Sequence, residues 1–305
     1  MRVLFGSQLH NQATTWEAIK ATLQTMDAGR WSSAWFYDHF IPPFSFTAEV
    51  MEHDRIATFE GWSLLSGAAA VTNRLRLGLL VAGNTYRNPA LLAKMAATVD
   101  HMSNGRLEIG IGAAWNIREH QAYGWEFPSA KERSDRLEEA CKLLKVLFTA
   151  DGLVDFQGEY YTLKQAPFEP KGVQQPHPPI LVGGTGEKRT LRTLAMYGDI
   201  MNVIASPEEF KRLIGVLERH CEDVGRDPAT IRKTVHVPIR IMADEARAAE
   251  LRRGDDWNMI GPVPFVIDRV NDFIEAGVDE FMMSAIPNKP AVYEELDKEI
   301  LSAFA

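Results

Sequence analysis

The chain has 305 residues, of which 46% are hydrophobic and 24% charged, and its formal net charge at pH 7 is -8. This is the composition of an ordinary globular protein with a large core, and the acidic balance argues against a nucleic-acid-binding protein, which normally has a basic face. The two cysteines, Cys141 and Cys221, form no CxxC motif, which excludes a disulfide framework and a zinc pattern. No segment has the ~18 apolar residues that span a membrane, and the short apolar run at the N-terminus predicts no signal peptide. We therefore expect a cytoplasmic protein with no membrane partner.

Strand-like and helix-like segments alternate in the first half of the chain. The best-delimited helix follows Asn88, a good N-cap, has Pro89 at its first position and ends before Gly105. The other expected helices are Thr15–Ala28, Ala57–Ala70 and Lys131–Phe148, the last with one apolar face that includes Cys141. The expected strands are Arg2–Leu9, Ser33–Tyr37, Arg74–Ala82 and Arg106–Gly112.

An insertion at about 149–178, rich in Gly, Pro and aromatic residues, interrupts this alternation, and Val154–Leu163 within it is expected to form a hairpin. Strands then follow at Pro179–Val182, Asp199–Val203, Thr234–Met242 and Glu280–Ser284. The helices between them are expected at Glu187–Tyr197, Pro207–Val224 and Pro264–Ala276. Eight strands with helices between them predict an α/β fold, a parallel sheet closed into a TIM (β/α)8 barrel, as one domain over residues 1–305.

In such a barrel, ligands bind at the carboxyl ends of the strands. Small and polar residues follow five of the expected strands at that end, at His10-Asn11, Asp38-His39, Asn84-Thr85, Trp115-Asn116 and Gly183–Gly186. On the fourth strand, Ile109 and Ile111 lie on one face while Gly110 and Gly112 lie on the other. If the bulky face packs on the outer helices, the glycine face leaves a slot for a flat ring at the mouth. The alternative is that glycine only permits a bulge there.

The stretch ILVGGTGEKRTLR, Ile180–Arg192, is the best candidate anion site. A strand runs into Gly183, Gly184, Thr185 and Gly186, and a helix is expected to begin near Glu187. Free backbone N–H groups at a helix start attract phosphate, and glycine allows the backbone to approach it closely. The stretch matches neither GxGxxG nor a P-loop, so a glycine-rich turn without a ligand stays an alternative.

Asp38 and His39 end the apolar run AWFYDHFIPP, Ala34–Pro43. Their residue types alone fit a metal site, a proton-transfer pair or a capped loop without chemistry. A metal at His39 would need His10 and Asp38 as partners, because the eight histidines show no HxH or HExxH spacing, and we predict no metal. Nucleophilic hydrolysis has no support, since GxSxG is absent and neither cysteine lies at a predicted rim.

Three segments resemble the bacterial luciferase-like monooxygenase superfamily, and specifically its oxidoreductases that depend on the deazaflavin coenzyme F420. They are Arg74–Pro128, Pro178–Asn202 and FYDHF, Phe36–Phe40, and they stand in the family's order and spacing. The resemblance implies a luciferase-like TIM barrel with an insertion, assembled as a homodimer, that binds FMN or F420 at the barrel mouth. It also implies that the cofactor ring rests on strand three, over a bulge with a non-proline cis peptide within Leu79–Ala82.

The resemblance further implies which residues contact the cofactor. Those near the ring or the ribityl chain are Asp38, Leu80, Val81, Ala82, Asn84, Gly112 and Trp115. Those at the cofactor phosphate are Gly183, Gly184, Thr185 and Gly186.

The same resemblance gives His39 a catalytic acid/base role, since an imidazole gains and releases protons near neutral pH. Related dehydrogenases place a second proton-transfer glutamate after the strand-four glycines. This chain has Trp115 at that position, and the nearest carboxylate is Glu119, roughly one helical turn further on. The absence of a glutamate at this position favours a hydride transfer that uses His39 as its single proton-transfer group, and it argues against sugar-phosphate oxidation.

We therefore expect an F420-dependent oxidoreductase that acts on a small-molecule substrate, which the sequence does not identify. The alternative is an FMN-dependent monooxygenase that uses reduced flavin and O₂. A third reading is a flavin-binding protein without catalysis. Fold alone does not separate these classes.

Overall fold

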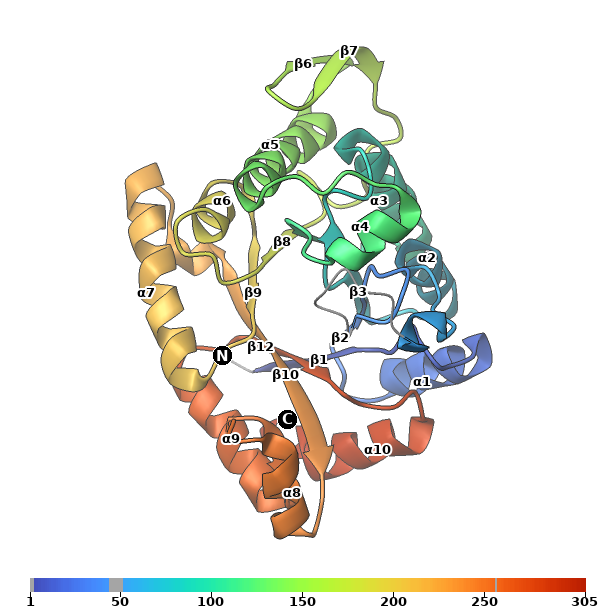
Figure 1. Ribbon diagram of the computed structural model, residues 1–305, viewed down its shortest axis with the longest axis vertical. Helices are drawn as coiled ribbons and strands as arrows, with labels where there is room; N and C mark the ends of the chain where they lie inside the picture. The colour runs from blue at the N-terminus through green and yellow to red at the C-terminus, as the bar shows by residue number, and fades with distance from the viewer. Residues whose placement is uncertain (1–2, 44–51, 256) are drawn as a thin grey trace.

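The chain folds into a closed barrel of parallel strands surrounded by helices, which confirms the expected TIM barrel (Figure 1). The computed structural model describes residues 3–43, 52–255 and 257–305. The ring closes because β10 pairs with β9 on one side and with β12 on the other. The eight barrel positions are occupied by β1 (Leu4–Gln8), β2 (Ser33–Phe36), β3 (Arg76–Leu79) continued by β4 (Ala82–Gly83), β5 (Leu107–Gly112), β8 (Ile180–Gly183), β9 (Ile200–Val203), β10 (Arg232–Ile241) and β12 (Glu280–Ser284).

Helices cover the outside of the barrel (Figure 1). They are α1 (Trp16–Ala28), α2 (Gly61–Val71), α3 (Pro89–Ser103), α5 (Ala130–Thr149), α6 (Thr190–Tyr197), α7 (Pro207–Val224), α9 (Val263–Glu275) and α10 (Pro290–Glu299). The expected punctuation of α3 is present, since the Asn88 side chain accepts from the N–H of Ala90 and Pro89 begins the helix. Within the described ranges, no helix combines the length and the apolar character needed to cross a membrane.

Some elements differ from the expectation. Several elements were not among the predicted ones. They are α4 (Ile117–Tyr123), α8 (Glu245–Arg252), α10, β11 (Met259–Gly261) and the 3-10 turns η1 (Glu52–Arg55), η2 (Pro228–Thr230) and η3 (Leu301–Phe304). Helix α2 begins at Gly61 and not at Ala57, because the Glu60 carboxylate accepts from the N–H groups of Trp62 and Ser63 and so caps the helix there.

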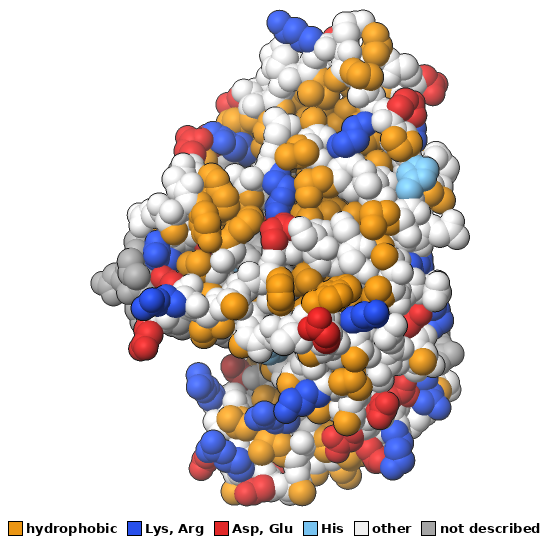
Figure 2. Space-filling model, turned by 90° about the vertical axis from the view of Figure 1, so that its right-hand side faces the viewer, with side chains coloured by type: hydrophobic (Ala, Val, Ile, Leu, Met, Phe, Trp, Pro, Cys, Tyr) orange, Lys and Arg blue, Asp and Glu red, His pale blue; other side chains and the backbone are white. Residues whose placement is uncertain are grey.

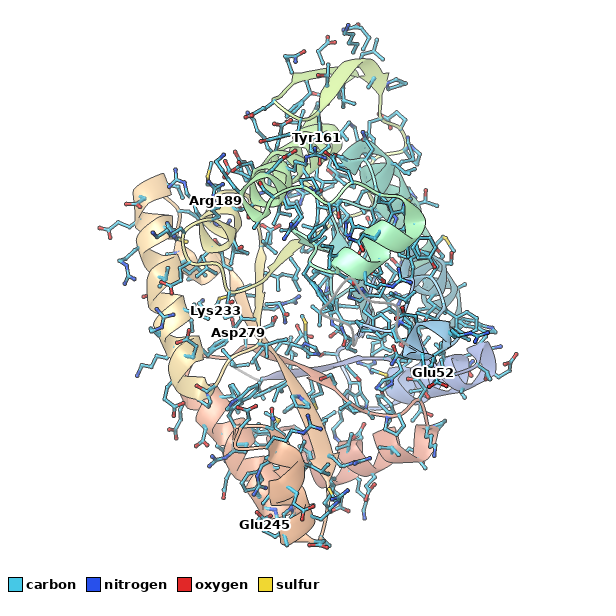
Figure 3. All side chains as sticks on the ribbon, viewed as in Figure 1. Glu52, Tyr161, Arg189, Lys233, Glu245 and Asp279 are labelled. Carbon is cyan, nitrogen blue, oxygen red and sulfur yellow. The ribbon has the colours of Figure 1, made fainter. Side chains whose placement is uncertain are left out.

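The insertion carries the expected antiparallel hairpin, β6 (Leu153–Gln157) and β7 (Thr162–Pro167). Its tip is fixed by Glu139 of α5, whose carboxylate accepts hydrogen bonds from the backbone N–H groups of residues 159, 160 and 161. Tyr161 consequently lies between the hairpin and α5 (Figure 3). Its hydroxyl accepts a hydrogen bond of 3.2 Å from Asn84 Nδ2, so the insertion touches a predicted cofactor residue.

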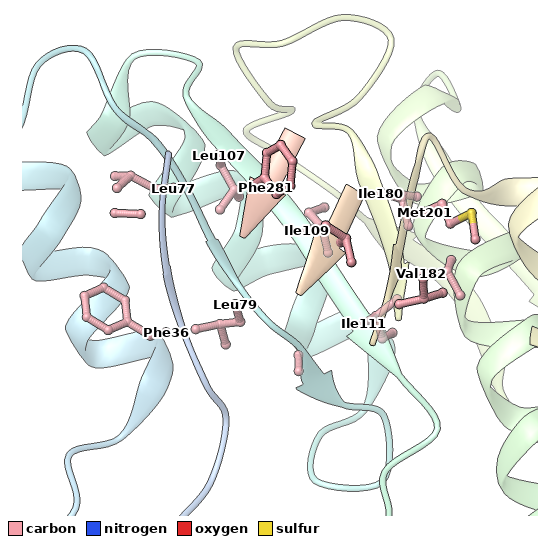
Figure 4. Close-up of a cluster of buried hydrophobic side chains, with 14 of the residues drawn as sticks. Phe36, Leu77, Leu79, Leu107, Ile109, Ile111, Ile180, Val182, Met201 and Phe281 are labelled. Atoms are coloured by element: carbon pink, nitrogen blue, oxygen red, sulfur yellow. The ribbon is translucent and has the colours of Figure 1, made fainter. Parts of the chain in front are cut away.

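The outward faces of the barrel strands form the main apolar core together with the helices (Figure 4). On β5 the outward residues are Leu107, Ile109 and Ile111, all fully buried, as expected for the bulky face of that strand. Both cysteines are buried and free, in agreement with the prediction that Cys141 is a small core residue.

A buried ionic layer closes the opposite end of the barrel from the mouth. Glu108 of β5 is 1% exposed and pairs with Arg76 of β3 and, at 2.5 Å, with Arg232 of β10. Arg232 also lies 3.3 Å from Glu280 of β12, which accepts a hydrogen bond of 2.5 Å from Ser33 of β2. These residues stand at the amino ends of their strands, so they form the barrel floor.

Replacing Glu108 with alanine is expected to reduce the free energy of unfolding by about 3 kcal/mol, because it leaves two guanidinium groups facing each other without their shared carboxylate. The control Arg247→Ala breaks an exposed pair with Glu250 and is expected to change stability by less than about 1 kcal/mol. Urea unfolding of the purified variants measures both. Equal losses for the two variants would contradict a structural role of the ionic layer.

Candidate functional site

The barrel mouth brings His39 and Glu119 together. His39 follows β2, while Glu119 lies in α4 after β5, and the His39 Nδ1 atom is 2.8 Å from Glu119 Oε2. The His39 side chain is 13% exposed. Its ring stands edge-on to the Trp115 ring, with centroids 5.3 Å apart. Trp115 is 42% exposed, so an aromatic face at the mouth adjoins the imidazole.

Glu119 is a fully buried carboxylate with four hydrogen-bond donors. Oε2 accepts from His39 and from the Tyr86 hydroxyl at 2.6 Å, and Oε1 accepts from the backbone N–H groups of Phe40 at 2.6 Å and Ile41 at 3.1 Å. Burial opposes ionisation, but the bonds from His39, Tyr86 and the backbone outweigh it and hold the pKa of Glu119 below its usual value. An ionised carboxylate only accepts, so Nδ1 of His39 carries a proton. Nε2 of His39 has no hydrogen-bond partner among the residues that the structure describes and is open to a ligand.

The sequence identified Glu119 as the nearest carboxylate but did not pair it with His39. A usable signal was present in the tetrapeptide NIRE, Asn116–Glu119. Asn116 caps α4 by accepting from the N–H of Glu119 at 3.3 Å, which is the arrangement that an Asn followed three residues later by Glu indicates. That signal locates the helix, whereas the contact with a loop eighty residues away depends on the barrel.

Asp38 lies behind the mouth and is 1% exposed. Its carboxylate accepts two hydrogen bonds from Arg87, at 2.5 and 2.9 Å, and one from the N–H of Gly83 at 3.1 Å. Arg87 also donates to Glu60 at 2.7 Å. Asp38 therefore anchors β4 and the loop after it, and its direct contact with a cofactor stays a prediction.

The third barrel strand is broken at a cis peptide bond between Leu80 and Val81, within the segment Leu79–Ala82 for which the family resemblance implied such a bond. The N–H of Leu80 donates to Phe36 O at 2.7 Å, and its carbonyl accepts from Gln8 Nε2 at 2.9 Å. Leu80 and Ala82 are buried, and Val81 is partly exposed.

The glycines of β5 and β8 accommodate this break. A Cβ at Gly110 would overlap the carbonyl oxygen of Leu79. One at Gly112 would lie 2.7 Å from the Val81 side chain, and one at Gly183 would lie 2.9 Å from it. Of the two interpretations of the glycine face, the bulge is therefore the one that the packing supports, because Val81 fills the space that a flat slot would have needed.

Asn84 and the loop after β8 provide the free polar groups at this rim. The N–H of Asn84 donates to Gly112 O at 3.0 Å, and its Oδ1 is buried without a hydrogen-bond partner among the described residues. In the β8 loop, Gly184 has φ +123°, and the turn after it delays α6 until Thr190, beyond the predicted start near Glu187.

The N-terminus of α6 has no side-chain cap. Four consecutive backbone N–H groups in this loop have no acceptor within the described part of the chain. They belong to Thr185, Gly186, Glu187 and Lys188. Gly184, Thr185 and Gly186 are exposed and Gly183 is partly exposed. Exposed backbone donors ahead of a helix fit a phosphate group, and phosphate binding here stays a prediction.

No group of three or more His, Cys, Asp or Glu side chains is placed to hold a metal ion in residues 3–43, 52–255 and 257–305.

Gly110→Ala is expected to reduce the free energy of unfolding by about 3 kcal/mol, because the added Cβ would meet backbone that no rotamer change can move. The matched control is Gly215→Ala in α7, where the nearest atom is 3.9 Å from the added Cβ, and it is expected to stabilise by about 0.4–1 kcal/mol. Urea unfolding measures the difference. A neutral Gly110→Ala would show that β3 does not approach β5 in this way.

The chain matches the family model described as luciferase-like monooxygenase over residues 2–280. It belongs to the luciferase-like monooxygenase family. Among curated relatives, it is 35% identical to the F420-dependent glucose-6-phosphate dehydrogenase of Amycolatopsis mediterranei (strain U-32) over 155 residues, which are 50% of this chain and 43% of that protein.

Two solved structures share the fold. An F420-dependent secondary alcohol dehydrogenase in complex with an F420-acetone adduct superposes with a TM-score of 0.83 at 22% identity, covering 100% of this chain and 98% of that one. The long-chain alkane monooxygenase LadA superposes with a TM-score of 0.82 at 13% identity, covering 99% and 91% of the two chains. At these identities the likeness concerns the fold.

Proposed function

We propose that this protein is an F420-dependent oxidoreductase that transfers a hydride between coenzyme F420 and a small organic substrate. The observation that carries the proposal is the pair of His39 and Glu119 at the barrel mouth, with Nδ1 of the histidine bound to a carboxylate and Nε2 left for a ligand. A second support is the resemblance of the sequence to F420-dependent dehydrogenases, among them the one from Amycolatopsis mediterranei.

The residues present fit such a cofactor. The open N–H groups of Thr185–Lys188, in the loop that Gly183–Gly186 begin, would hold its phosphate, and the exposed Trp115 ring and Val81 would flank its ring. Asn84, which follows β4, offers an amide oxygen that has no partner within the described ranges. When bound, F420 supplies the two-electron chemistry. Hydride transfer from reduced F420 does not require the activation of O₂, whereas the FMN-dependent monooxygenase reaction does.

The chain itself would bind, orient and move a proton. His39 Nε2 would give a proton to the substrate oxygen or carbon, or take one from it in the reverse direction. Glu119 would hold the imidazole in one tautomer and one orientation, and Tyr86 would fix Glu119 by its hydrogen bond. The pKa of Tyr86 is raised mainly by its burial and, to a smaller extent, by the neighbouring carboxylate of Glu119. The Tyr86 hydroxyl therefore stays protonated and continues to donate its hydrogen bond.

We further propose that the protein works as a homodimer. The surface that carries α2 and α3 shows several groups of apolar side chains between charged ones (Figure 2). On α3, Leu91 is 54% exposed and Met102 is 46% exposed, which is the kind of apolar surface that a second copy would cover. Its partners would then be a small-molecule substrate and a second copy of the chain.

Cofactor titration tests the class of enzyme. Tryptophan fluorescence of the wild-type protein is expected to be quenched at micromolar F420 and not at the same concentration of FMN, since Trp115 lies exposed at the mouth. Trp115→Phe is the matched control, because it should lose most of the quenching while equilibrium dialysis still detects bound F420. A preference for FMN would replace the proposal by the FMN-dependent monooxygenase.

Variants of His39 and Glu119 test the mechanism. Their turnover is measured with the hydride acceptor that reacts fastest with the wild type, chosen from a panel of ketones, aldehydes and activated alkenes. His39→Ala is expected to lower kcat at least ~10²-fold while F420 affinity stays within about threefold. Glu119→Gln keeps the shape of the side chain and is expected to lower kcat about tenfold without raising the KM for F420. His101→Gln, on the outside of α3, should behave as wild type. Unchanged turnover in His39→Ala would remove this residue from the mechanism.

A further inference from the structure

The inward face of β10 carries a histidine that the proposed reaction leaves unused. One parity of β10 faces the barrel interior, because Arg232 reaches Glu108 on β5 and Thr234 accepts a hydrogen bond of 2.9 Å from Asn202 on β9. His236 follows on the same face, two residues nearer to the carboxyl end of the strand and hence nearer to the mouth.

His236 has an unsatisfied ring nitrogen. Its Nε2 atom is buried and has no hydrogen-bond partner among the residues that the structure describes, although the residue as a whole is only partly buried. In the strand register it lies opposite Met282, which belongs to an interior apolar cluster with Trp35 and Leu181. Burial lowers the pKa of His236 to about 4, so the ring is uncharged at neutral pH. A ligand oxygen that pairs with this nitrogen would remove the unfavourable state of an unpaired buried group.

The groups around His236 are also uncharged. On β12, Ser284 continues the inward face and lies opposite Pro238 in the strand register. On the β9 side, Asn202 is already bonded, and Ile204, the next residue of the same parity, is 60% exposed. The charged residues on this face of β10, Arg232 and Arg240, each lie four residues away, about 13 Å by strand rise.

The position of this wall relative to His39 follows from the order of the strands. In the ring of eight, β10 is separated from β2 by β12 and β1. His236 and Ser284 therefore face the mouth from a different side than His39, which follows β2. A substrate whose reacting carbon lies at His39 would reach them only with another part of its structure.

We propose that His236 binds a second oxygen of the substrate, an uncharged hydroxyl or carbonyl remote from the reacting carbon. The substrate is then an alcohol or ketone with a further uncharged oxygen function, and not a phosphate ester or a carboxylate. An uncharged imidazole offers a hydrogen bond but no charge to compensate for the desolvation of an anion. This inference rests on the proposed function, because it places the substrate of that reaction at the barrel mouth.

Three matched series of 2-alkanones of graded chain length test the proposal: unsubstituted, with a terminal hydroxyl, and with a terminal carboxylate. For the F420-loaded wild-type protein, we expect kcat/KM at the best chain length to be at least tenfold higher for the hydroxyl series than for the unsubstituted series. The difference should come from a lower KM and not from a higher kcat. The carboxylate series should be the poorest. His236→Phe keeps a ring without nitrogen and should abolish the preference, while kcat/KM for the unsubstituted series stays within about threefold. His236→Gln, which restores a donor and an acceptor, should recover part of it.

Any of four results would overturn the proposal: no hydroxyl preference in the wild type, a preference for the carboxylates, turnover of none of the three series, or a preference that survives His236→Phe. The F420 titration is run on the same preparations. Failure to bind F420 counts against the proposed function, whereas F420 binding without a hydroxyl preference counts against His236 alone. Thermal unfolding of each variant verifies that it is folded.

Discussion

The arrangement of the barrel mouth depends on one buried carboxylate. Glu119 comes from α4 and accepts hydrogen bonds from His39, Phe40 and Ile41 in the loop after β2 and from Tyr86 in the loop after β4. A buried carboxylate is tolerated only when its oxygens are paired, so the two loops must stay where they are for Glu119 to stay ionised. The tautomer of His39 follows from the same bonds, and with it the nitrogen that the proposed reaction uses.

The two ends of the barrel interior are built from different kinds of residues, ion pairs at the floor and glycines at the mouth. At the floor, Glu108 and Glu280 with Arg76 and Arg232 join strands from opposite sides through ion pairs. At the mouth, glycines leave room for the backbone of the third strand to break and for Val81 to lie over β5 and β8. The ion-paired floor closes one end of the barrel, while the glycines and the polar rim residues lie at the other end, where the proposed ligand would bind.

Much of this could be predicted from the sequence because it is local. Strand and helix periods gave the eight strands, and the bounds of α7 and β12 agree with the prediction to the residue. The rim residues followed from the ends of the strands. The helix α4 could have been predicted from Asn116 and Glu119, since a capping pattern is local as well. The start of α6 could not, because residues 187–189 form a turn whose shape depends on the loop before it.

The sequence by itself determined the barrel and the position of His39 at its rim, because alternation, punctuation and order along the chain are properties of near neighbours. The resemblance to the family added that Trp115 stands where related dehydrogenases have a glutamate. Only the tertiary structure decided that Glu119 is the partner of His39, that Asp38 is held by Arg87, and that a buried nitrogen of His236 has no partner among the described residues. These relations join residues on different strands and loops. Their distances are set by how the barrel closes and not by their separation along the chain.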